Sequence, residues 1–194
     1  MKRMKQFNVA KIFIITLIII GIIFGIMYFY MQEDLSKTLI YDKLANISSI
    51  IKDSNQKMIV VHLITIVILL FLSYSIIGMP LILFYLFYEC TSLGFLIASF
   101  YASFSIKGVI FALIYILISK AIYIICLVYI CYIALKITKK LLRVLLLKEQ
   151  ESLYTLLKNL FLKLGIALVV IIIYDLFLYF GANKILSFFL FLLK

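Results

Sequence analysis

Long apolar stretches alternate with short polar ones along the whole chain, and this pattern predicts the secondary structure. The hydrocarbon core of a bilayer is about 30 Å thick, so a helix needs about 20 apolar residues to cross it. The apolar stretches have room for about five such helices. The expected spans are residues 12–31, 58–79, 80–104, 108–135 and 164–180. The pattern therefore predicts an all-α, polytopic helical bundle in a membrane.

The segment 32–57, between the first two expected spans, is the only long polar segment in the first half of the chain. Its apolar residues recur every three to five positions, which places them on one face of a helix with the charges opposite. These residues are Leu35, Leu39, Leu44, Ile47 and Ile51. We expect an external amphipathic helix. Its apolar face either rests on the membrane or the bundle, or docks a partner protein.

Two interruptions divide the apolar region between residues 58 and 135. Proline lacks the backbone N–H that continues a helix, and it disfavours helical dihedrals in the preceding residue. Gly78 and Pro80 therefore predict a helix-breaking turn on the inner side, between spans 2 and 3. We expect a second turn outside, at residues 105–108. Ser119 and Lys120 then interrupt span 4 near its middle, where this helix can be broken.

The second half of the chain contains one strongly basic segment and one short apolar tail. Residues 136–163 carry leucines and basic side chains at helical spacing, which predicts a cytoplasmic helix at the membrane surface. The tail 181–194 has too few apolar residues to cross a bilayer alone, so it is either an interfacial hook or the end of a tilted helix. Without repeats or linkers, residues 1–194 form a single membrane domain.

Composition excludes a water-soluble domain. Of the 194 residues, 67% are hydrophobic and 14% are charged, whereas soluble domains are nearer half apolar and a quarter charged. The net charge of +11 comes from basic blocks that flank the spans. This distribution predicts a multi-pass cell membrane protein with a cytoplasmic N-terminus. It also favours anionic membrane lipids, and not nucleic acid, as partners of the basic blocks.

The sequence offers little chemistry for an enzyme, and we expect no catalytic residue, metal or cofactor. His62 is the one histidine, and no metal, phosphate or dinucleotide motif is present. We expect His62 to keep its ring hydrated near the outer end of span 2, and a proton relay is the alternative role. Cys90, Cys126 and Cys131 lie in apolar sequence without Cys-x-x-Cys spacing, so they are expected to pack in the core.

Three charged residues lie inside expected spans: Glu89, Lys120 and Asp175. A charge in the middle of a membrane costs a few kcal/mol and normally faces the bundle interior beside a partner. We predict a Glu89–Lys120 ion pair between spans 3 and 4 that fixes how these helices align. Transport of an ion or proton is the alternative role. Asp175 has no obvious partner in the sequence; Tyr and Ser hydroxyls or a neighbouring subunit could satisfy it.

Gly21 and Gly25 form a Gly-x-x-x-Gly pattern in span 1. Small residues at this spacing allow the backbone of a second helix to approach closely. The second helix belongs either to the same chain or to another copy in a homodimer.

The stretch from Gly78 to Leu135 resembles the stage II sporulation protein M family of membrane proteins. The matching pieces are its Gly-x-Pro start, the Ser-Leu-Gly-Phe segment at residues 92–95 and the segment "SIKGVIFAL" at residues 105–113. Family members commonly have Lys-Gly where this chain has Glu89-Cys90. They have Leu-Pro-Gln-Asn where it has residues 117–120. Both departures fall on the predicted ion pair, which suggests a linked exchange.

The resemblance implies a non-enzymatic membrane scaffold. Members of the family look like anchors that recruit peptidoglycan hydrolases, stage II sporulation proteins P and D, to the septum during sporulation and engulfment. The external segment 32–57 would then be the docking surface. A small permease subunit of an ABC-type exporter is the alternative function, with the basic helix at residues 136–163 coupling to a separate ATPase.

Overall fold

The computed structural model describes residues 2–45, 47–73, 75–147, 153–182, 185, 188 and 189. These residues form α-helices, one short π-helix and no strand, which confirms the predicted all-α class. The elements are α1 (Lys2–Tyr30), α2 (Asp34–Ala45), α3 (Ile47–Leu72), α4 (Gly78–Ser119), α5 (Ala121–Leu147), α6 (Leu153–Phe177) and the π-helix η1 (Leu178–Ala182).

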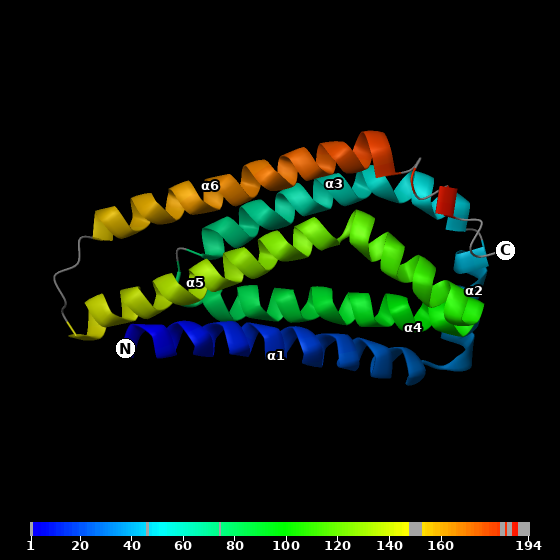
Figure 1. The fold of residues 1–194 in the computed structure, drawn as a ribbon, viewed down its shortest axis with the longest axis horizontal. Helices are drawn as coiled ribbons and strands as arrows, with labels where there is room; N and C mark the ends of the chain where they lie inside the picture. The colour runs from blue at the N-terminus through cyan, green and yellow to red at the C-terminus, as the bar shows by residue number, and fades with distance from the viewer. Residues whose placement is uncertain are drawn as a thin grey trace.

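The long helices lie side by side in an elongated bundle (Figure 1). The N-terminus lies at the same end of the bundle as the end of α5 and the start of α6 (Figure 1). Helix α2 and the end of α6 lie at the opposite end (Figure 1). Three of the described helices are long and apolar enough to cross a membrane, within Val9–Tyr30, Gly78–Ser119 and Ala121–Val144, and Val60–Leu72 is a shorter apolar helix.

Helix α4 reverses direction at Ser105, inside the predicted external turn. Ser105 has φ 53° and ψ −140°, whereas the rest of α4 is helical. Residues 106–119 therefore fold back beside residues 78–104 (Figure 1). Gly108 allows this close approach, because a Cβ atom there would lie 2.1 Å from the carbonyl oxygen of Phe100. Phe100, Phe111 and Ala112 are buried together across the reversal.

The chain breaks a second time at Lys120, where the sequence marks a possible interruption of span 4. Helix α4 ends at Ser119 and α5 begins at Ala121, with Lys120 at φ −134° between them. Figure 1 shows the bend between the two helices. The stretch 108–135 therefore consists of two helical pieces that meet at a charged residue.

The turn between α3 and α4 lies before the predicted position. Helix α3 ends at Leu72 and α4 begins at Gly78, so Gly78 and Pro80 already belong to the first turn of α4. Proline is tolerated there because the first N–H groups of a helix have no acceptor within it. Gly78 is needed for close approach, since a Cβ atom would lie 1.9 Å from the carbonyl oxygen of Leu72.

Two other predicted segments do not form the separate helices that the sequence analysis expected. The external segment 32–57 is not one helix, because α3 begins at Ile47 and continues without interruption into the apolar residues of span 2. The segment 136–163 is not a separate surface helix: its first part extends α5 to Leu147 and its last part begins α6 at Leu153. Continuing a helix satisfies the next backbone groups, so the polar boundary does not end it.

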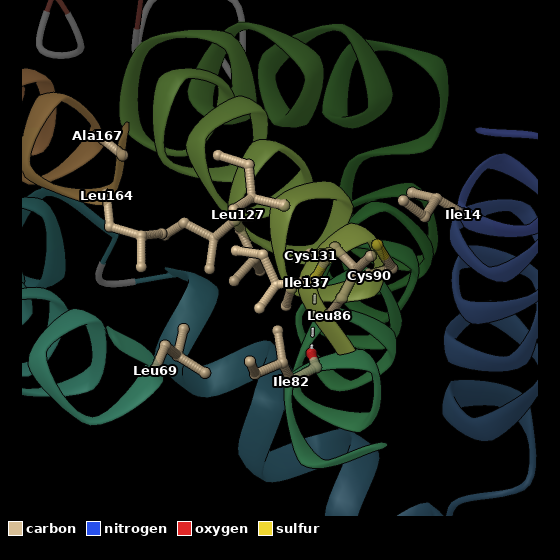
Figure 2. Close-up of a cluster of buried hydrophobic side chains, with 13 residues drawn as sticks. Ile14, Leu69, Ile82, Leu86, Cys90, Leu127, Cys131, Ile137, Leu164 and Ala167 are labelled. Atoms are coloured by element: carbon tan, nitrogen blue, oxygen red, sulfur yellow. Dashed lines mark hydrogen bonds between the residues drawn. The ribbon is translucent and has the colours of Figure 1, made fainter. Parts of the chain in front are cut away.

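The main core cluster joins five helices, and Figure 2 shows its side chains meeting between α1, α3, α4, α5 and α6. Its members include Ile14, Leu69, Ile82, Leu86, Cys90, Leu127, Cys131, Ile137, Leu164 and Ala167. Many large apolar side chains point outward instead, such as Ile12 at 61% exposed and Phe161 at 73%. An outer surface this apolar suits lipid and not water.

Candidate functional site

The candidate site is a set of polar side chains buried in the middle of the bundle, beginning with the predicted ion pair. Lys120 Nζ donates a hydrogen bond to Glu89 Oε2 at 3.2 Å. The two side chains are only 17% and 9% exposed. Glu89 lies in the first half of α4, and Lys120 occupies the break between α4 and α5. The structure thus brings together the two charges that the sequence analysis paired.

Two tyrosines extend this pair, and the sequence analysis missed both. Tyr85 lies one helical turn before Glu89 and donates its hydroxyl proton to Glu89 Oε1 at 2.7 Å. Its oxygen lies 2.8 Å from the hydroxyl oxygen of Tyr123 in α5. Since the single proton of Tyr85 points to Glu89, Tyr123 donates the second hydrogen bond. Both carboxylate oxygens of Glu89 therefore have a donor. The spacing of Tyr85 and Glu89 by four residues is the one signal in the sequence that could have found this contact.

His62 and Asp175 form a second pair, which corrects the predictions for both residues. His62 Nδ1 lies 3.1 Å from Asp175 Oδ1. The His62 ring stacks on Tyr123 with 4.1 Å between the ring centroids. His62 is only 3% exposed, so its ring does not lie at the protein surface in contact with water. The partner of Asp175 was not apparent because it lies 113 residues away, on a neighbouring helix.

We call these six residues the polar chain: His62, Tyr85, Glu89, Lys120, Tyr123 and Asp175. They connect α3, α4, α5 and α6. Each of the two acids, Glu89 and Asp175, contacts a basic side chain. Its hydrogen bonds run from Lys120 to Tyr123, and only ring stacking joins Tyr123 to His62. This arrangement can hold four helices in one alignment, because each buried charge requires its partner.

The helix break contributes further polar groups at the same place. The Tyr174 hydroxyl donates to the carbonyl oxygen of Ile118 at 2.8 Å, which satisfies one of the acceptors that the end of α4 leaves open. Three buried side-chain oxygens have no hydrogen-bond partner among the described residues: Ser119 Oγ at this break, Asp175 Oδ2, and Thr138 Oγ1 farther along α5. The described part of the chain contains no group of three or more metal-binding side chains. Its three cysteines are buried and form no disulfide.

The glycines of span 1 pack against the same chain. A Cβ atom on Gly25 would lie 2.0 Å from the carbonyl oxygen of Thr91, and one on Gly21 would lie 2.8 Å from Cys90 Cβ. Gly94, which the sequence analysis did not assign to packing, faces them: its Cβ would lie 2.1 Å from the carbonyl oxygen of Ile22. These glycines let α1 and α4 touch along their backbones, so this face is occupied without a second copy.

The residues of the predicted docking face on segment 32–57 do not share one environment. Leu39 of α2 is 58% exposed. Leu44 is half-buried and packs against the cluster of Phe100, Phe111 and Ala112. The side chains of Leu35, Ile47 and Ile51 lie outside the part that the structure describes. A hollow of about 270 Å³ lies near this end of the bundle, lined by Tyr41, Ala102, Ser103 and Phe104.

Comparison with known proteins places the chain in a family. No curated protein and no solved structure matches it. The family described as stage II sporulation protein M matches residues 14–185, which include the whole polar chain, the glycine contact between α1 and α4 and both breaks around residues 105 and 120. Because this match covers most of the chain, the protein belongs to the stage II sporulation protein M family.

Proposed function

We propose that this protein is a non-enzymatic membrane scaffold that recruits peptidoglycan-remodelling proteins to the septum during sporulation and engulfment. The observation that carries this proposal is family membership over residues 14–185. The partners would be membrane-anchored cell wall hydrolases, similar to stage II sporulation proteins P and D. The bundle itself would provide a rigid anchor, and the polar chain would keep its helices aligned.

The polar chain supports a scaffold more than the alternative, a small permease subunit of an ABC-type exporter. A permease needs a polar path with groups free to bind a passing ion, but here both carboxylate oxygens of Glu89 accept hydrogen bonds and one oxygen of Asp175 contacts His62. It also needs a cytoplasmic coupling helix. The segment 136–163, which was the candidate, is divided between the ends of α5 and α6.

The distribution of charge supports a cytoplasmic N-terminus. Ile14, Ile137 and Leu164 are buried in one cluster, and each follows a lysine within three residues: Lys11, Lys136 and Lys163 respectively. The basic positions beside these three residues therefore lie at the same end of the bundle. Basic residues of this kind collect on the cytoplasmic side of a membrane. Helix α2 and the reversal of α4 would then face outward, where cell wall proteins are found.

Leu39 is the residue of the docking face that we propose as the contact with a partner. It is exposed on α2, in a segment that we place outside the membrane, so its burial by another protein would be favourable. Leu44 is unsuitable as a probe because its replacement would also disturb the cluster around Phe100.

The test is affinity capture of the tagged protein from cross-linked native membranes, with identification of bound proteins by mass spectrometry. Leu39→Asp is expected to reduce capture of a cell wall hydrolase by about tenfold, which corresponds to about 1.4 kcal/mol of lost contact. Thr38→Asp is the matched control, since it adds the same charge to the neighbouring exposed position of α2. Both variants should accumulate in the membrane at wild-type levels.

Two outcomes would contradict the proposal. Equal capture by wild type and Leu39→Asp would remove α2 from the docking surface. Capture of an ATPase in place of a hydrolase, through the basic ends of α5 and α6, would favour the permease subunit.

A further inference from the structure

Asp175 has one carboxylate oxygen that the polar chain does not use. Its Oδ1 lies 3.1 Å from His62 Nδ1, whereas its Oδ2 has no hydrogen-bond partner among the described residues. The residue is only 2% exposed, so water outside the protein does not reach this oxygen. A buried carboxylate oxygen without a partner is unfavourable, because it has lost its hydration and gained no hydrogen bond in return. Oδ2 is therefore available to a small ligand.

The negative charge of Asp175 favours a cation as this ligand. A neutral imidazole can donate one N–H to Oδ1 but brings no charge to balance the carboxylate. The lysine of the polar chain, Lys120, is already bound to Glu89, with 3.2 Å between Nζ and Oε2. The Asp175 carboxylate also interacts electrostatically with the side chains of Tyr123 and Tyr174, which offer oxygen atoms but no positive charge. A small cation beside Oδ2 would supply both the missing partner and the missing charge.

The end of α4 meets the segment around Asp175 and adds further oxygen atoms. Tyr174 donates its hydroxyl proton to the carbonyl oxygen of Ile118 at 2.8 Å. Asp175 and Ser119, the residues that follow these two, therefore belong to segments in direct contact. Ser119 is fully buried, and its Oγ likewise has no hydrogen-bond partner in the part of the chain that the structure describes. Helix α4 ends at this residue, and the C-terminal end of a helix carries a partial negative charge.

We propose that Asp175 and the end of α4 bind one monovalent alkali cation, Na⁺ or K⁺. Asp175 Oδ2 is the charged ligand, and Ser119 Oγ is the hydroxyl ligand. Hard cations prefer oxygen ligands, and broken helices of membrane proteins use their C-terminal ends to coordinate such ions. A divalent or transition metal is less suited, because the described residues contain no group of three or more His, Cys, Asp or Glu side chains that could hold one.

The proposed ion has a structural role and is not cargo. His62, Ser119 and Asp175 are each at most 3% exposed, so they enclose the ion inside the bundle. An ion held there balances the buried carboxylate and joins the end of α4 to α6. The inference goes beyond the proposed scaffold function and does not depend on it.

The experiment measures thermal unfolding of the purified full-length protein in detergent with three chloride salts. Sodium, potassium and N-methylglucamine chloride are compared at about 100 mM each, so that only the alkali cation differs. At least one alkali cation is expected to raise the unfolding temperature by about 3 °C or more relative to N-methylglucamine, because a ligand bound only by the folded state stabilises it. Binding of the radioactive cation to the immobilised protein measures occupancy directly.

Three variants locate the site. Asp175→Asn keeps the shape of the side chain but removes its charge, and it is expected to abolish both the rise in unfolding temperature and cation binding. Ser119→Ala removes one uncharged ligand and is expected to weaken cation binding by about tenfold. It is the deciding variant if Asp175→Asn does not fold. Thr138→Val is the matched control, because Thr138 Oγ1 is also buried without a partner but lies farther along α5. This control should bind the cation as the wild type does.

Three results would overturn the proposal. Equal unfolding temperatures in all three salts would mean that His62 balances Asp175 without an added ion. Wild-type cation binding by Ser119→Ala would remove the end of α4 from the site. An equal loss of binding in Thr138→Val and Ser119→Ala would replace the site by a general response to the loss of a buried hydroxyl group.

Discussion

At the scale of single residues, the polar chain explains an unusual feature of this sequence. Glu89 and Lys120 are two charged residues in apolar sequence, and they lie 31 positions apart along the chain. In the structure the two side chains touch, with 3.2 Å between Lys120 Nζ and Glu89 Oε2. A buried charge without a partner would be costly, whereas a charge of the other sign beside it offsets most of that cost. The geometry therefore supports the pairing of these two charges.

This pairing leads to a charge-swap prediction. Glu89→Gln leaves Lys120 as an unpaired buried cation and should lower the free energy of unfolding by about 3–5 kcal/mol. Lys120→Met leaves the carboxylate unpaired and should cost a similar amount. The double variant Glu89→Lys with Lys120→Glu should recover much of the loss, because the pair is restored with its polarity reversed. Thermal unfolding in detergent and accumulation in the membrane measure these effects.

The stability of the double variant is the decisive measurement. If it is no more stable than the two single variants, the ion pair does not hold α4 and the break before α5 together. Recovery in the double variant would also separate a structural role from ion transport, because a specific transport path would not be expected to survive reversal of its charges.

At the scale of elements, the contact between α1 and α4 depends on three glycines that remove the Cβ atoms between two backbones. Gly21 and Gly25 of α1 face α4, and Gly94 of α4 faces α1. Without side chains at these positions the two backbones come into van der Waals contact around Gly21, Gly25 and Gly94, and such contact is a main source of packing energy inside a membrane. The Gly-x-x-x-Gly pattern predicts such contact but not the helix that provides it.

Gly25→Ala tests this contact with the smallest possible side chain. Its Cβ would lie 2.0 Å from a backbone oxygen of Thr91, so α1 must move away from α4. We expect a loss of about 1–3 kcal/mol in the free energy of unfolding. Gly165→Ala is the control, because no atom lies within 4 Å of the Cβ it would add and alanine favours a helix over glycine.

The control should therefore unfold at the wild-type temperature or slightly above it. If Gly25→Ala did the same, α1 would not pack against α4 through this face, and contact with a second copy would return as an interpretation of the glycine pattern.

At the scale of the whole molecule, the ends of the bundle differ in charge. The N-terminus, the end of α5 and the start of α6 meet at a basic end, whereas α2 lies at the other (Figure 1). Acidic residues of α2, such as Asp34 and Asp42, belong to this second end. An asymmetry of this kind orients a membrane protein with its basic end in the cytoplasm.

Single cysteines introduced at the two ends test this orientation. Thr38→Cys on α2 should react with a membrane-impermeant maleimide in intact cells, whereas Lys158→Cys on α6 should react only after lysis. Both positions are exposed, and the three native cysteines are buried, so wild-type protein serves as the unlabelled control. Labelling of Lys158→Cys in intact cells would reverse the proposed orientation and place α2 in the cytoplasm.

The sequence by itself determined the features that depend on each residue's own preference for lipid, water or helix. These include the all-α class, the reversal within residues 105–108 and the break at Ser119 and Lys120. Even the Glu89–Lys120 contact could be predicted, because a lone charge in an apolar helix requires a partner and few candidates exist. The error at Gly78 and Pro80 arose because proline was taken as the end of a helix, although it is tolerated in the first turn of one. The errors at the two surface helices arose because a polar boundary was taken as a helix end.

Only the tertiary structure decided which helix faces which. The contact of His62 with Asp175, the hydrogen bond between Tyr85 and Tyr123, and the choice of α4 as the partner of the α1 glycines all depend on the order and rotation of helices in the bundle. Hydropathy reports only how deeply a residue prefers to lie in the membrane. The neighbours of a side chain are set by packing between segments far apart in the chain, and no local pattern encodes them.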